Sequence, residues 1–296
     1  MVLRSRPAPR PLLACEIFPD RVLAARASVQ RDFVELHTAR QLPAGAVNPS
    51  LTAPNIADPS AVSQVVAEAL AGVSGRSRDV IAVLPDAAVR TVLLEFDSLS
   101  QDAQEAAGVI RFRLKKSLPF DVEKSSLSYH AQAAGTAVKV VVSVALASVV
   151  HEYENLFIQA GYHPGVVLPS TLAALGTVDA GRPTLVIKVG ERGTTVAIVD
   201  QQELRLFRTL DIALTNPAKL VDEVYPSLVF FQDQFGASVE RILVGGVNSA
   251  RELAPVLSSH TAAPIEDLVA SRYIGGSLSG DTQSGPLAGV VGALLG

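Results

Sequence analysis

The chain has 296 residues, which exceeds the length at which a single hydrophobic core usually keeps growing, so we expect two lobes. Hydrophobic residues make up 48% and charged residues 18%, a composition typical of a folded α/β protein and not of a disordered chain. The net charge of -4 argues against a nucleic-acid-binding surface, because such surfaces are usually basic. The single cysteine, Cys15, excludes an intramolecular disulfide, and we expect it to be buried and inert in a reducing cytoplasm.

The first residues resemble an export signal only superficially. Arg4 and Arg6 precede a short apolar stretch at 12–15, but prolines interrupt it. A secretory signal needs about 7–15 apolar residues, and a membrane-spanning helix needs about 18. No run in the sequence approaches that second length. We therefore predict a cytoplasmic protein that meets a membrane only through partners.

The order of predicted elements in the first part of the chain recurs in the second part. In the first part, apolar patterns predict three strands, a helix and a strand at 12–18, 21–29, 32–40, 58–72 and 80–84. In the second part, they predict three strands, a helix and a strand at 184–189, 194–199, 203–212, 217–235 and 241–244. A β-β-β-α-β order that occurs twice predicts two related lobes with a cleft between them.

A different unit is predicted between the two halves. Its strand, helix, two strands and second helix are expected at 90–96, 98–116, 126–132, 138–147 and 148–160. We interpret Ser98-x-x-Gln101 as a capping box at the start of the first helix, and Ser148 as the cap of the second. The buried stripe of the first helix is expected to comprise Ala103, Ala107, Ile110 and Leu114. Together these elements form a β-α-β-β-α insert.

After the insert, the chain is predicted to return to the first lobe. A strand is expected at 166–168 and a helix begins at 169. An Ala-, Val- and Leu-rich pattern at 285–295 predicts a last helix that is too short to span a membrane. We expect this helix to pack inside the protein.

Four short sequences resemble phrases of one protein family. They are VLPDAAV at 83–89, similar to ALPGSAV; IRFRLKKSLPF at 110–120, similar to a helix ending in IPF; LVFFQDQF at 228–235, similar to LDYYRSQF; and ILVGG at 242–246, similar to ILLSGGG. Their order and spacing, together with the insert, resemble the PilM group of type IV pilus assembly proteins. Relatives of that group include the division protein FtsA and the L proteins of type II secretion. The resemblance covers nearly the whole chain, from 12 to 295.

The resemblance implies a fold and a division of the chain. The fold is α/β and actin-like, of the two-lobed Hsp70/actin ATPase type, with the FtsA/PilM-type β-α-β-β-α insert, also called SHS2. The first lobe would comprise 1–86, 163–181 and 284–296, the insert 87–162, and the second lobe 182–283.

The resemblance also implies a nucleotide cleft that holds ATP and Mg²⁺ as cofactors. Two β-hairpin turns, one in each lobe, present backbone N–H groups to the phosphates in such a cleft. Glu16 matches the acid of the first hairpin, but Phe18 and Pro19 replace small residues there. Pro19 also lacks an N–H donor, so this turn is poorly suited to phosphate.

The second hairpin and the adenosine-side turn match the family pattern more closely. Gly190, Gly193 and Thr194 fit the hairpin, but Lys188 stands where an acid is expected and cannot hold Mg²⁺. The adenosine side is matched by Gly245 and Gly246, followed by Asn248. A Gly-Gly pair after a strand is also common in turns that bind nothing. We interpret the chain as a pseudo-ATPase and leave nucleotide binding open.

A partner-binding role is implied for three apolar residues at the end of the first insert helix. Phe112, Leu118 and Phe120 lie beside two lysines at the start of a loop. The plainer interpretation is that they fill the core of the insert. PilM-like proteins, however, receive the N-terminal cytoplasmic peptide of a bitopic membrane protein, PilN, between the first lobe and the insert. By resemblance, these residues are candidates to contact that peptide.

The sequence thus favours a cytoplasmic adaptor at the inner membrane, which docks a PilN-like protein and contacts other pilus components on the motor side. An adaptor of type II secretion with the same fold is one alternative, and an active ATPase or sugar-kinase-like enzyme is another. No catalytic or metal-ligating set is predicted, because the five histidines are scattered and no serine has a hydrolase nucleophile setting.

Overall fold

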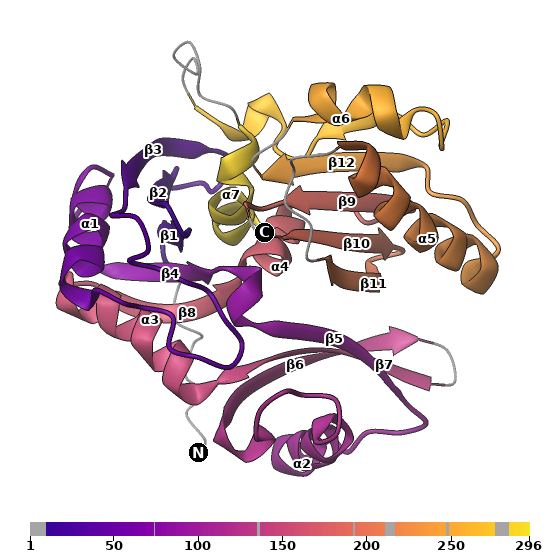
Figure 1. Cartoon of the computed structure of the whole chain (residues 1–296), viewed down its shortest axis with the longest axis horizontal. Helices are drawn as coiled ribbons and strands as arrows, with labels where there is room; N and C mark the ends of the chain where they lie inside the picture. The colour runs from indigo at the N-terminus through magenta and orange to yellow at the C-terminus, as the bar shows by residue number, and fades with distance from the viewer. Residues whose placement is uncertain are drawn as a thin grey trace.

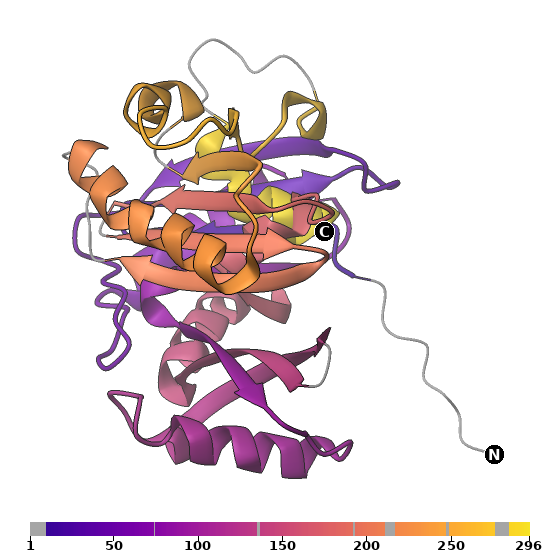
Figure 2. The same cartoon turned by 90° about the vertical axis from the view of Figure 1, so that its right-hand side faces the viewer.

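The computed structural model describes residues 10–73, 75–134, 137–191, 193–210, 217–246, 249–275 and 284–296. These residues form two five-stranded sheets and one three-stranded sheet (Figure 1). The two larger sheets lie next to each other, and the three-stranded sheet lies below them in both views (Figure 2). The predicted residues 135–136, 211–212 and Asn248 lie outside the described ranges.

The first lobe is built on a sheet whose strands run in the order β3-β2-β1-β4-β8. They are β1 (Leu13–Ile17), β2 (Arg21–Ala27), β3 (Val34–Gln41), β4 (Asp79–Leu84) and β8 (His163–Pro169). The central strand β1 is buried throughout, and it pairs antiparallel with β2 and parallel with β4. Helix α1 (Pro59–Ala71) covers one face and begins where the Asp58 carboxylate accepts the N–H of Ala61.

The second lobe repeats this arrangement, with strands in the order β11-β10-β9-β12-β13. They are β9 (Thr184–Val189), β10 (Thr194–Asp200), β11 (Glu203–Leu210), β12 (Arg241–Gly246) and β13 (Ile265–Asp267). Here too the first strand pairs antiparallel with the second and parallel with the fourth. Helices α5 (Pro217–Phe235) and α6 (Ala250–Leu257) pack on one face. The predicted duplication of strand order is confirmed.

The insert consists of the sheet β5-β7-β6 and one helix on its outer face. Its elements are β5 (Arg90–Phe96), α2 (Ala103–Leu114), β6 (Ser125–Ala134) and β7 (Ala137–Leu146). Ile110 and Leu114 of α2 are buried against the valines of β7. The insert therefore has a small apolar core of its own.

The structure corrects both predicted helix starts in this region. Helix α2 begins after Asp102, whose carboxylate accepts the N–H groups of Gln104 and Glu105, and not at Ser98. A carboxylate that satisfies two N–H groups of the first turn defines the start more strongly than the predicted capping box. The buried face accordingly includes Ala106 instead of Ala103.

The second of these helices, α3 (Ala147–Gln159), has no side-chain cap, and Ser148 lies inside it. Its buried residues, which include Tyr153 and Phe157, pack in the core of the first lobe together with residues of α1 and β4. The prediction grouped this helix with the insert, but its apolar face belongs to the first lobe.

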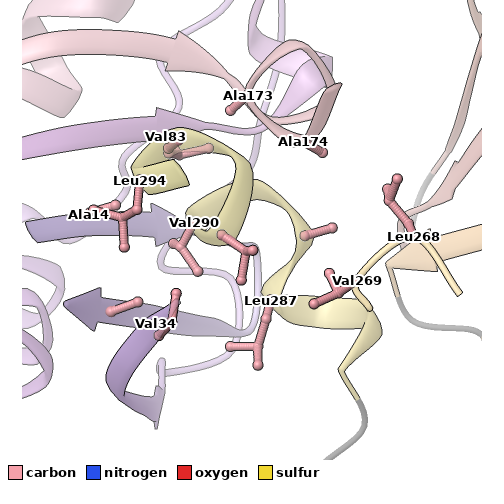
Figure 3. Packing of buried hydrophobic residues seen from close by; sticks show 14 of the residues in the cluster. Ala14, Val34, Val83, Ala173, Ala174, Leu268, Val269, Leu287, Val290 and Leu294 are labelled. Atoms are coloured by element: carbon pink, nitrogen blue, oxygen red, sulfur yellow. The ribbon is translucent and has the colours of Figure 1, made fainter. Parts of the chain in front are cut away.

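The last helix lies in an apolar core that both lobes share. Helix α7 (Ala288–Leu295) packs against α4 (Ser170–Ala174), and all residues from 288 to 294 are buried (Figure 3). A Cβ atom on Gly292 would lie only 2.1 Å from the Ala173 carbonyl oxygen, so only glycine allows this approach. The prediction of a packing helix is confirmed. In the described parts of the chain, no helix has both the length and the apolar character needed to cross a membrane.

Candidate functional site

The two lobes meet around a cavity of about 490 Å³, which we call the central cleft. Glu16 at the end of β1 and Lys188 in β9 line it from the two lobes, and Ser170 at the start of α4 lies between them. Pro49 of a first-lobe loop and Pro119 of the insert also form part of its wall. The central cleft therefore reaches from the junction of the lobes to the junction of the first lobe and the insert.

A buried ion pair links the two lobes at the floor of the central cleft. Lys188 Nζ lies 3.4 Å from Glu16 Oε1, and the two side chains are only 7% and 1% exposed. The Ser170 hydroxyl joins both groups, because it donates to Glu16 Oε1 and accepts from Lys188 Nζ. Lysine stands at position 188, where the family pattern has an acid. The Glu16 carboxylate therefore has a cationic partner, whereas a second carboxylate at 188 would repel it.

Asp86 forms a second polar bridge between the lobes. It lies in a short 3-10 turn directly after β4, and its carboxylate accepts the backbone N–H of Thr171 at 2.9 Å and the Thr171 hydroxyl. The Thr195 hydroxyl of β10 donates to the same carboxylate at 3.1 Å. Both carboxylates at the floor of the cleft are thus engaged by side chains of the protein itself.

The hairpin turns also use their own donors. The N–H of Phe18 donates to the Arg21 carbonyl at 2.8 Å, and the N–H of Gly190 donates to the Gly193 carbonyl at 2.8 Å. Arg21 of the first hairpin lies 3.5 Å from Glu191 of the second, so an ion pair connects the two turns across the cleft. These groups are therefore occupied where a phosphate would need free donors.

Burial raises the pKa of Glu16 above its ordinary value, while the Lys188 charge and the Ser170 hydrogen bond oppose this shift and the Asp86 charge adds to it. The second carboxylate oxygen, Oε2, is buried and has no hydrogen-bond partner among the described residues. A Cβ atom on Gly289 of α7 would lie 2.1 Å from it. The absence of a side chain at 289 thus leaves the space that this oxygen fills.

The raised pKa of Glu16 predicts a pH dependence of folding. The pKa of Glu16 in the folded state lies above its unfolded value of about 4.3. The contribution of protonated Glu16 to the free energy of unfolding is therefore complete below pH about 4.3, and it is lost as the pH rises through the folded-state pKa. We expect wild type to lose stability relative to Glu16→Gln as the pH rises above about 4.3, measured by urea unfolding. A wild type that gains stability relative to Glu16→Gln over that range would contradict this direction.

The glycine pair at the end of β12 has a packing role. Gly246 has a φ of +92°, and a Cβ atom there would lie 1.9 Å from the Val189 carbonyl oxygen. A Cβ atom on Gly245 would lie 2.9 Å from the Leu268 side chain. The close approach of β12, β9 and the segment after β13 therefore suffices to explain both glycines without a nucleotide.

Three features of the central cleft are unfavourable to Mg-ATP. Glu16 Oε1 and the Asp86 carboxylate accept hydrogen bonds from protein groups, Phe18 and Pro19 occupy the first turn, and Lys188 replaces the second acid. Among the described residues, no three His, Cys, Asp or Glu side chains are placed to hold a metal ion. Of the predicted nucleotide residues, Glu16, Gly190 and Gly193 line the central cleft, while Thr194 is buried at the start of β10 and the Gly245–Gly246 pair ends β12.

The three predicted partner-contacting residues are not brought together. Leu118 and Phe120 are partly buried against the core of the insert, whereas Phe112 is 81% exposed on α2. Pro119, which lies between the first two in the sequence, lines the central cleft together with Pro49 and Leu51. The proline is thus positioned by side chains that anchor the loop on either side of it.

Sequence reasoning missed the polar partners of the cleft. Asp86 stood within one of the family-like phrases, but nothing in the sequence indicated that its carboxylate would reach Thr171 and Thr195. Ser170 opens a helix of only five residues, and no motif marks it. The available signal was Lys188, which stands where an acid is expected. A buried cation requires a carboxylate close by, so this lysine indicated an acidic partner in the cleft.

Comparisons with known proteins identify the fold. A solved structure of a PilM–PilN type IV pilus biogenesis complex aligns with 97% of this chain and 98% of its own, with a TM-score of 0.80 and 20% sequence identity. The cytoplasmic domain of EpsL, an inner-membrane component of the type II secretion system of Vibrio cholerae, aligns over 88% and 98% of the two chains, with a TM-score of 0.51 and 11% identity. The ethanolamine utilization protein EutJ from Carboxydothermus hydrogenoformans aligns over 98% and 91%, with a TM-score of 0.52 and 8% identity.

These neighbours share the actin-like ATPase fold, and the chain has the same fold. The predicted fold and the resemblance to PilM-type proteins are therefore confirmed as a likeness of fold. No protein-family model matches the sequence, and no curated protein matches it.

Proposed function

We propose that the chain is an adaptor of a type IV pilus assembly machine, which binds a PilN-like inner-membrane protein at the cytoplasmic side. The observation that carries this proposal is the agreement over 97% of the chain with a PilM–PilN complex at a TM-score of 0.80. At 97% coverage the agreement includes most of the insert, so the two chains share the backbone arrangement on which the proposed partner site is built. By the same reasoning, the adaptor is peripheral to the membrane and contacts motor-side components.

The partner segment in this proposal is an extended apolar peptide from the N-terminus of the PilN-like protein. The central cleft suits such a peptide, because Pro49 and Leu51 of the first lobe and Pro119 of the insert all line it. Leu118 and Phe120 contribute by fixing the loop that carries Pro119, and exposed Phe112 lies on the same insert. Apolar walls with a few polar groups favour extended peptides.

Substitution of Leu51 by glutamate tests this site. We expect it to weaken binding of a peptide comprising the cytoplasmic N-terminus of the PilN-like protein by about tenfold or more, because the carboxylate must be desolvated against apolar groups. Fluorescence anisotropy with the labelled peptide measures the change. The matched control is Leu36→Glu on β3, an exposed leucine away from the cleft. Wild-type affinity in Leu51→Glu, or no binding to wild type, would contradict the proposed site.

The central cleft in this proposal joins the lobes instead of hydrolysing ATP. The Glu16–Lys188 pair and the Asp86 bridge support this, since they occupy the groups that phosphates and Mg²⁺ would require. Purified protein is expected to show no Mg-dependent ATP turnover above the rate of Glu16→Ala. Turnover that Glu16→Ala abolishes would establish an active enzyme and reject the pseudo-ATPase.

A role as an adaptor of type II secretion is the second candidate, and the alignment with the EpsL cytoplasmic domain favours it. That alignment has a TM-score of 0.51 over 88% of the chain, against 0.80 over 97% for the pilus protein. Genes for PilN- and PilO-like proteins beside the gene of this chain would favour the pilus assignment. Genes for a secretion ATPase and pseudopilins there would favour the second candidate.

A further inference from the structure

Helix α2 presents a protruding aromatic side chain on the outer side of the insert. Both views show α2 beyond the insert sheet, on the side away from the two larger sheets (Figure 1 and Figure 2). Ile110 and Leu114 of α2 are buried against the sheet, and Phe112 lies two residues from each, on the opposite face of the helix. Phe112 is 81% exposed, the highest value for a large hydrophobic side chain among the described residues. No residue of α2 lines the central cleft, so this face is separate from the proposed peptide site.

Cations surround Phe112 at the C-terminal end of the helix. They are Arg111, Arg113, Lys115 and Lys116. Among the described residues, none of these four forms an ion pair. The acids of α2 are at the other end of the helix and have partners, because Asp102 caps the first turn and Glu105 accepts a hydrogen bond from the Ser100 hydroxyl at 2.6 Å. The helix therefore has a basic end in a chain whose net charge is -4.

The element packed next to this end of α2 does not neutralise it. The short 3-10 turn Val122–Lys124 packs on the insert core beside α2, and its acidic groups are Asp121 and Glu123. Residues 111–124 contain five cations and two carboxylates, so the local charge stays positive. Cations at the C-terminal end of a helix also stabilise it through the helix dipole. That effect does not explain why an aromatic ring is exposed among them.

The outer face of α2 suits a fluid surface better than a rigid partner. A helix on the outside of a small sheet is convex, and Val109 on the same side is also exposed. A protein partner would have to supply a pocket for the Phe112 ring. An anionic bilayer supplies negative charge and an apolar phase together: the long basic side chains reach the headgroup phosphates, while the ring enters the boundary between headgroups and acyl chains.

We propose that the outer face of α2 binds the surface of an anionic lipid bilayer, with Phe112 inserted at the headgroup level. Each lysine or arginine near such a surface strengthens binding by about fivefold. One aromatic side chain and four cations give weak, reversible attachment, because stable anchoring needs a second signal. This direct contact goes beyond the expectation that the protein meets a membrane only through partners. Under the proposed function, the membrane partner would provide the second signal.

Insertion is tested with a tryptophan reporter. The chain has no tryptophan, so Phe112→Trp places a single emitting group at the proposed contact. We expect its emission to shift to shorter wavelength with vesicles of phosphatidylcholine and phosphatidylglycerol, and to be quenched by brominated acyl chains, because the indole leaves water. Phe230→Trp on α5 is the matched control, also at an exposed helical phenylalanine, and its emission is expected to stay unchanged. Unchanged emission of Phe112→Trp would exclude insertion.

Charge recognition is tested by co-sedimentation of the full chain with the same vesicles, without any partner protein. We expect binding that weakens with added salt, and a loss of at least about tenfold in the double variant Lys115→Glu with Lys116→Glu. The matched control, Arg76→Glu with Arg251→Glu, changes the net charge equally at exposed positions outside the insert and is expected to bind as wild type does. Binding of the PilN-like peptide is expected to be unchanged in the double lysine variant, so the two proposals fail separately.

Four results of the co-sedimentation would overturn the proposal. They are the absence of binding to the mixed vesicles, equal binding to vesicles of phosphatidylcholine alone, an equal loss of binding in the two double variants, and displacement from the vesicles by soluble polyglutamate that binds as tightly as they do. The second result would exclude recognition of anionic lipid, and the third would exclude a specific face. The fourth would identify an acidic protein as the occupant.

Discussion

Replacement of Lys188 by methionine is expected to lower the free energy of unfolding at pH 8 by about 3–5 kcal/mol. The reason is that Glu16 is 1% exposed and Lys188 is its cationic partner, so the variant leaves a buried carboxylate without a counter-charge. Methionine has a similar length and retains the apolar contacts of the lysine stem. Urea unfolding followed by circular dichroism measures the change.

Three comparisons identify the cause of that loss. At pH 5 the loss is expected to be smaller, because Glu16 can then take up a proton in the variant. The double variant Glu16→Gln with Lys188→Met is expected to lose less than Lys188→Met alone, which gives a coupling energy for the pair. Lys116→Met, at an exposed position, is the control and is expected to leave stability nearly unchanged. A similar loss for Lys188→Met at both pH values would contradict the role of the ion pair.

Substitution of Gly292 by alanine is expected to lower the free energy of unfolding by about 3 kcal/mol. The added Cβ atom would lie 2.1 Å from the carbonyl oxygen of Ala173 and 2.7 Å from the Cα of Ala174. Both atoms belong to the backbone of α4, so the helices must separate within the core that the lobes share. Thermal and urea unfolding of the variant measure the loss.

Gly108→Ala provides the matched control for this substitution. Gly108 lies in α2, and no heavy atom comes within 4 Å of the position of an added Cβ atom. Alanine there is expected to raise stability by about 0.5–1 kcal/mol, since it restricts the unfolded chain and favours the helix. If both substitutions were stabilising, the close contact of α7 with α4 could not be a determinant of the fold.

Much of the architecture follows from apolar patterns that are local in the sequence. The bounds predicted for β9 and α5 agree with those observed, because a buried strand and a long amphipathic helix have strong periodic signals. The predicted start of α2 was wrong because Asp102 lies four residues after Ser98 and competes for the same role. The packing of α3 was also unpredictable, since an apolar helix face does not specify which core it joins.

The central cleft was only partly predictable for a different reason. The sequence showed that Lys188 replaces an acid, which predicted a poor Mg²⁺ site. The interaction of Lys188 with Glu16 and Ser170 links residues 172 and 18 positions apart, and such distances carry no sequence signal in a single chain. Gly246 is required because its backbone comes close to the Val189 carbonyl oxygen of a neighbouring strand. This contact also joins residues far apart in the sequence, so the packing role of Gly246 emerged only from the structure.

Three contacts across the central cleft bear on how the protein would act. Nucleotide-driven closure in two-lobed proteins requires lobes that can move about a hinge. Here the Glu16–Lys188 pair, the Asp86–Thr195 hydrogen bond and the Arg21–Glu191 pair all connect the lobes without a ligand. Under the proposed adaptor function, we infer that the chain presents its partner site constitutively.

The most direct test of this account is a calorimetric titration of the purified chain with the N-terminal peptide of the PilN-like protein, with and without Mg-ATP. The account predicts saturable peptide binding with the same affinity in both conditions, and no heat from Mg-ATP alone. Peptide binding that appears only with Mg-ATP would contradict the nucleotide-independent partner site, and a lack of peptide binding in both conditions would contradict the adaptor function.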